Sequence, residues 1–162
     1  MAKPLVLELE DDFPVQLIGI ICPEPNYRMA FLINQATHCY FSRAEKDVEF
    51  YDRKTELRSN FALYEFKDEE MMMDWYLVAN KFSAKSDAKD GELFTDSGTR
   101  KTYLVQDHQQ ADYFIQTMDD CNPALIGSMV KQLKSISSVI TAYTIDAEGL
   151  KHKEHLYFLH ED

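Results

Sequence analysis

The chain has 162 residues, of which 45% are hydrophobic and 28% are charged, and its formal net charge is −11. This length and composition fit one globular domain, residues 1–162, and the five glycines and five prolines exclude a fibrous or low-complexity chain. The acidic balance favours repulsion between copies and argues against direct binding of nucleic acid or of a membrane, since both attract proteins through clustered lysines and arginines.

The first half of the chain is expected to form one strand, one helix and several short strands. The apolar run 15–21 predicts a strand covered on both faces. Asn26 is the expected cap of a helix over 27–38, which is apolar around most of its circumference and is therefore predicted to be central. Two short strands are predicted at 39–42 and 48–51, followed by a hairpin at 60–66 and 72–82 across an acidic turn. The hairpin residues expected to face the core are Met73, Trp75, Leu77 and Ala79.

The second half begins with the polar segment 83–92, which is predicted to be a mobile loop, and a strand is expected at 102–105. A short amphipathic helix is predicted over 107–118, with Asp107 as its cap. The apolar residues that share one face of this helix at i, i+3, i+4 and i+7 are Ala111, Phe114, Ile115 and Met118.

A second helix should begin at Pro123 after the cap residue Asn122. The remaining segments predict a strand at 139–144, a turn at 146–149 and a closing strand at 155–159. Strands outnumber helices and do not alternate with them regularly. The fold class expected is therefore α+β, with a mainly antiparallel sheet and two or three helices packed on one face.

Motifs that carry chemistry are scarce. The sequence lacks the serine-hydrolase elbow, the phosphate-binding loop and the dinucleotide fingerprint. The spacing of its three cysteines and five histidines fits neither a disulfide framework nor a metal site. We therefore predict no catalytic residue, no metal and no cofactor. No apolar stretch resembles a signal peptide or a membrane span, which favours a cytoplasmic location.

Asp112 and Tyr113 lie side by side on the polar face of the predicted 107–118 helix, and two interpretations of them are open. The pair could be presented to a ligand, in a pocket completed by Arg28 and Asn34. Alternatively, Asp112 accepts hydrogen bonds from a neighbouring loop while Tyr113 packs its ring and bonds through its hydroxyl. The second interpretation is favoured, because no base or nucleophile stands beside the pair in sequence.

The same stretch resembles the signature of the bacterial IPExxxVDY family, which has no assigned activity. The matching residues are Val105, Gln106, Asp107, Ala111, Asp112, Tyr113 and Phe114, where the family's Pro and Glu are replaced by Gln106 and Asp107. Further likeness is seen at 17–20, 27–28, 32–34, 142–143 and 150–151, so the resemblance spans nearly the whole chain. It implies a cytoplasmic bacterial protein whose genes tend to lie near those for acyl carrier protein, ribonuclease III and pyruvate kinase.

The function expected from these observations is a non-catalytic protein-interaction or accessory domain, with an unidentified protein partner or a homodimer. The first alternative is an enzyme or small-molecule binder with a pocket beside the 107–118 helix. The second is an accessory to RNA metabolism that acts through a protein partner, as the gene context of the resembled family suggests.

Overall fold

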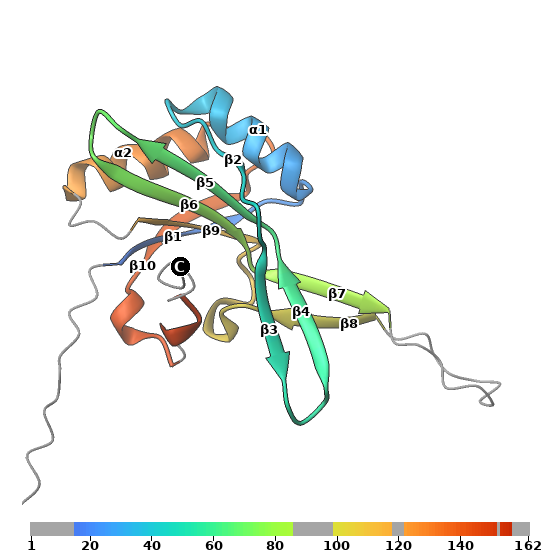
Figure 1. Cartoon of the computed structure of the whole chain (residues 1–162). Helices are drawn as coiled ribbons and strands as arrows, with labels where there is room; N and C mark the ends of the chain where they lie inside the picture. The colour runs from blue at the N-terminus through green and yellow to red at the C-terminus, as the bar shows by residue number, and fades with distance from the viewer. Residues whose placement is uncertain (1–14, 86–98, 118–121, 152, 157–162) are drawn as a thin grey trace, which may run out of the picture.

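The computed structural model describes residues 15–85, 99–117, 122–151 and 153–156 (Figure 1). A six-stranded antiparallel sheet forms the centre of the fold. In spatial order its strands are β10 (Thr141–Ile145), β1 (Gln16–Ile21), β9 (Tyr113–Thr117), β6 (Met73–Ala79), β5 (Leu63–Asp68) and β2 (Ser42–Arg43).

Helices α1 (Asn26–Ala36) and α2 (Pro123–Lys134) cover one face of this sheet (Figure 1). Two hairpins, β3 (Val48–Asp52) with β4 (Leu57–Phe61) and β7 (Lys81–Lys85) with β8 (Thr99–Tyr103), extend from the opposite side. Short 3-10 turns lie there too, namely η1 (Gln106–His108), η2 (Ala147–Gly149) and η3 (Lys153–Leu156). The predicted α+β class, with helices gathered on one face, is confirmed.

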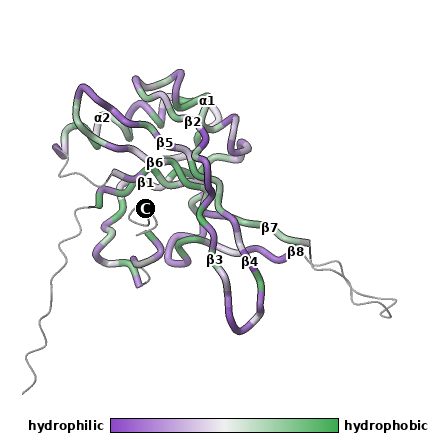
Figure 2. Tube along the Cα trace, viewed as in Figure 1, coloured by the Kyte–Doolittle hydropathy of each residue, from purple (hydrophilic) through white to green (hydrophobic). Residues whose placement is uncertain are grey.

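The sheet separates two hydrophobic cores. Between sheet and helices, Ile18, Trp75 and Leu77 pack against Met29 and Leu133. On the other face, a second core contains Phe61, Val78, Leu104, Phe114 and Leu156. Figure 2 shows the hydrophobic residues concentrated in the central strands, whereas the β3–β4 hairpin is largely hydrophilic. The central strands are therefore buried on both faces, and the predicted core set of β6 is confirmed.

The predicted helix over 107–118 is wrong. Residues 106–108 form the 3-10 turn η1, and 113–117 form β9, an inner strand between β1 and β6. All five residues of β9 are buried. A short apolar run that is buried on both faces has no clear period, so its pattern also matches a helical stripe. Met118 lies outside the described residues.

The first helix also differs from expectation. Asn26 is its first residue, and Pro25 stands at the cap position without a side-chain hydrogen bond. Only Met29, Ala30 and Ile33 are buried, so α1 is a peripheral helix with further apolar residues on its exposed face. The second helix is as predicted, because the Asn122 side chain accepts the Ala124 amide at 2.9 Å and Pro123 follows the cap.

Two further predictions are corrected in part. Residues 83–85 of the predicted loop belong to β7, while residues 86–92 lie outside the described part of the chain. The predicted closing strand begins instead within η3, where a ring nitrogen of His155 lies 2.9 Å from the Leu104 carbonyl oxygen. Residues 157–159 are not among those described. Neither described helix is long and apolar enough to cross a membrane.

Candidate functional site

Asp112 lies where three segments of the sheet meet, one residue before β9. Its carboxylate accepts the Cys22 amide at 2.8 Å and pairs with the Lys81 ammonium at 2.7 Å. The backbone N–H of Asp112 donates to the Ile20 carbonyl at 2.8 Å. Its backbone carbonyl accepts the backbone N–H of Asn80 at 2.9 Å. The residue therefore ties the end of β1 to the junction of β6 and β7 through both main chain and side chain.

Tyr113 begins β9 and is 5% exposed. Its ring belongs to the core beneath the helices, and its hydroxyl donates to the Glu24 carbonyl in the segment that leads into α1. Burial, followed by the nearby Cys22 and Asp112, raises the pKa of this phenol. The phenol therefore stays protonated at neutral pH and serves as a hydrogen-bond donor.

Asn34 and Arg28, the other two residues predicted for a ligand site, lie on α1. The side-chain nitrogen of Asn34 donates to the Phe41 backbone carbonyl at 3.0 Å, and its side-chain oxygen accepts the Phe41 backbone N–H at 2.8 Å. These two bonds fix the loop after the helix. The exposed Arg28 guanidinium lies 5.5 Å from the centre of the Phe31 ring. Among the described residues, no hydrogen bond or ion pair joins either side chain to Asp112 or Tyr113, so their shared pocket stays a prediction.

Asn80 is the polar residue of this region that the sequence argument did not single out. It is fully buried, and its side-chain amide donates to the carbonyls of His108 at 2.9 Å and Ala111 at 2.8 Å. Its side-chain oxygen accepts the Val105 amide at 2.9 Å. A lone amide at the end of an apolar strand is the signal that could have identified it, because such a group needs partners once it is buried.

Two of the three cysteines, Cys22 and Cys39, are described, and both are buried free thiols. Burial raises the pKa of the Cys22 and Cys39 thiols, so both stay protonated and weakly nucleophilic at neutral pH. Within these ranges, no group of three His, Cys, Asp or Glu residues is placed to hold a metal ion.

The exposed face of α1 carries an aromatic pair. Tyr27 is 72% exposed and Phe31, one turn later, is 49% exposed, with Arg28 against the Phe31 ring. We call these three residues the α1 surface. They lie on the side of the helix that faces away from Met29 and Ile33, which are buried against the sheet.

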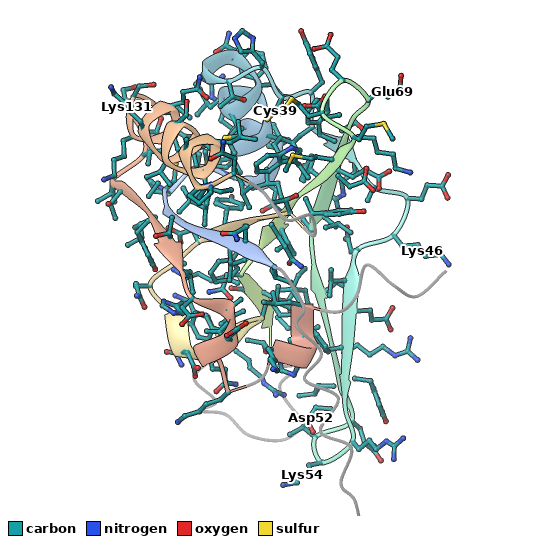
Figure 3. All side chains as sticks on the ribbon, turned by 90° about the vertical axis from the view of Figure 1, so that its left-hand side faces the viewer. Cys39, Lys46, Asp52, Lys54, Glu69 and Lys131 are labelled. Carbon is teal, nitrogen blue, oxygen red and sulfur yellow. The ribbon has the colours of Figure 1, made fainter. Side chains whose placement is uncertain are left out.

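A second group of exposed apolar residues lies near the C-terminal end of α1. Tyr40 is 74% exposed, with its ring 6.0 Å from that of Phe66. Met71 and Met72, in the turn between β5 and β6, are also exposed. Figure 3 shows Cys39, next to Tyr40, at the same end of the molecule as Glu69 in that turn. Exposed apolar residues are therefore not confined to the α1 surface.

A comparison with family models finds no match to this chain, and none is found among curated proteins or among solved structures.

Proposed function

We propose that this chain is a protein-interaction module that binds a partner protein through the α1 surface. The observation that carries the proposal is the exposed pair Tyr27 and Phe31 on a helix whose other face already packs on the sheet. The resemblance to the IPExxxVDY family, with its cytoplasmic bacterial setting, is compatible with an accessory role of this kind.

Side-chain chemistry supports this surface as a binding site. Burying a large apolar side chain contributes roughly 1.5–3 kcal/mol, and the exposed parts of Tyr27 and Phe31 leave a share of this contribution for a partner. Aromatic residues and arginine are also the types most enriched where binding energy concentrates in protein interfaces. Because Arg28 already lies against the Phe31 ring, part of the surface is ordered before binding.

The shape of the surface favours a protein over a small molecule. The outer side of a helix is convex, whereas small-molecule sites are concave and enclose most of their ligand. The partner segment expected here presents aliphatic side chains to the two rings and a carboxylate to Arg28. This arrangement places the binding energy on Tyr27, Arg28 and Phe31 and not on Asp112 or Tyr113.

The proposal is tested by crosslinked capture from native cells, followed by reconstitution with the purified captured protein. Tyr27→Ser combined with Phe31→Ser should weaken the reconstituted complex by at least about tenfold, which corresponds to roughly 1.4 kcal/mol. Arg28→Glu should weaken it as well, because a carboxylate would then face a carboxylate.

The matched control is Tyr51→Ser combined with Leu57→Ser, which removes two exposed apolar side chains from the β3–β4 hairpin. Figure 3 shows Asp52 and Lys54 of this hairpin at the opposite end of the molecule from Cys39. The control variant should bind the partner as the wild type does. Equal binding by the α1 variant and the wild type, or equal losses in both double variants, would refute the assignment.

A further inference from the structure

The outer strand β10 is an edge without the usual protection against pairing. Among the described residues it ends the six-stranded sheet on one side, where β1 is its only neighbour. No residue from Ser135 to Ile145 is charged, in a chain of which 28% is charged. Natural edge strands are normally guarded by lysine, proline or a bulge, because their unpaired amides and carbonyls form a template for another strand. β10 contains neither a charged residue nor a proline.

The strand at the other edge of the sheet, β2, is protected against pairing with another chain. β2 has only two residues, Ser42 and Arg43, and the Arg43 guanidinium pairs with the Asp47 carboxylate at 2.6 Å. A short strand with an ion pair beside it offers little to an incoming strand. Within the part of the chain that the structure describes, β10 is therefore the unprotected edge, and the neighbouring Ile140 adds an apolar side chain that is 73% exposed.

We propose that β10 pairs antiparallel with β10 of a second copy of this chain, so that two sheets become one across a two-fold axis near Tyr143. In that register Thr141 of each copy lies opposite Ile145 of the other, and Ala142 lies opposite Thr144. The strand is therefore complementary to itself, with small, β-branched and aromatic residues that suit a sheet. This inference is independent of the α1 surface.

The sequence of β10 favours a second copy as the occupant, because self-pairing in this register brings no like charges opposite each other. Two molecules of net charge −11 repel each other over most of their surfaces, and a charge-free edge is where they can meet. A basic partner would find no counter-charge along this strand. Because salt screens the residual repulsion between copies, dimerisation should strengthen as ionic strength rises.

Sedimentation equilibrium of the full chain at low and high salt tests the pairing. The wild type should dimerise, with tighter association at high salt. Thr144 is exposed on β10, so Thr144→Glu and Thr144→Lys should each fold, which circular dichroism checks. Each variant alone should raise the dimer dissociation constant by at least about tenfold, because like charges would face each other diagonally across the axis. An equimolar mixture of the two variants should restore association.

The control pair is Thr55→Glu and Thr55→Lys, which makes the same charge changes at the tip of the β3–β4 hairpin and should dimerise as the wild type does. Hydrogen exchange of the amides from 141 to 145 should slow with rising protein concentration. A wild type that stays monomeric at every salt and concentration, or Thr144 variants that dimerise normally, would overturn the pairing. The α1 double variant should still dimerise, so the failure of one proposal is distinguishable from the failure of the other.

Discussion

At the scale of single residues, buried polar side chains hold the segment from 104 to 113 in place. Asn80 satisfies one amide and two carbonyls of that segment with its side chain, and its main chain bonds to Leu104 and Asp112. A buried amide with every partner in place specifies one arrangement of the chain, since any shift leaves polar groups without partners in a low-dielectric interior.

Asn80→Ala should therefore be strongly destabilising. The change leaves the Val105 amide and the carbonyls of His108 and Ala111 without these partners, and the expected loss is about 3–5 kcal/mol of the free energy of unfolding. Denaturant unfolding measures it. Asn60→Ala, at an exposed position of β4, is the matched control and should cost less than about 0.5 kcal/mol. Equal stabilities of the two variants would contradict this role.

Tyr113 makes the fold sensitive to alkali. In the unfolded chain its phenol ionises near the ordinary value of 10.0, whereas burial raises its pKa in the folded protein. Above pH 10 the unfolded state therefore binds fewer protons than the folded state. The free energy of unfolding keeps its full value at lower pH and falls as the pH rises above 10. Tyr113→Phe should cost about 1 kcal/mol at neutral pH, through the lost bond to Glu24, and should reduce the alkaline fall.

Unfolding curves at neutral pH and above pH 10 measure both effects. Part of the alkaline fall should remain in the variant, because burial also raises the pKa of the Cys22 and Cys39 thiols and of the Tyr143 phenol. An alkaline fall of the same size in Tyr113→Phe and the wild type would show that Tyr113 does not contribute to it.

At the scale of elements, the packing of β10 on β1 depends on one glycine. A Cβ added at Gly19 would lie 2.9 Å from the Tyr143 ring, which occupies the space above it. Gly19→Ala should cost about 1–3 kcal/mol through this overpacking, and Tyr143→Val in the same chain should recover part of the loss.

The matched control is Gly127→Ala in α2. An added Cβ at Gly127 meets no atom within 4 Å, so this change should stabilise the protein by about 0.5–1 kcal/mol through helix propensity. Thermal unfolding compares the variants. If Gly19→Ala were stabilising as well, the proposed contact with the Tyr143 ring would be wrong.

The elements also show what the sequence can and cannot predict. The second helix was predictable because Asn122 and Pro123 act locally, through a cap and a fixed backbone angle. β9 was not, because its five buried residues face two cores that other segments supply. For the same reason, Asp112 and Tyr113 were recognised as a pair, but their partners Cys22, Glu24 and Lys81 are set by the topology.

At the scale of the whole molecule, the apolar residues serve two purposes. Most fill the two cores on either side of the sheet, where they hold the hairpins and turns of one face and the helices of the other. Others are exposed at the surface, among them Tyr27 and Phe31 on the outside of α1. We therefore separate the residues that stabilise the fold, Asp112 and Tyr113 among them, from those that we propose bind a partner.

The affinity of the reconstituted partner for two variants, measured beside their unfolding free energies, tests this separation most directly. Asp112→Asn removes the ion pair with Lys81 and should lower stability by about 1 kcal/mol while partner affinity stays unchanged. Tyr27→Ser combined with Phe31→Ser should do the reverse, with stability changed by less than about 1 kcal/mol and affinity reduced at least about tenfold. Lost affinity in Asp112→Asn, together with normal binding by the α1 variant, would place the site beside β9 and contradict the account.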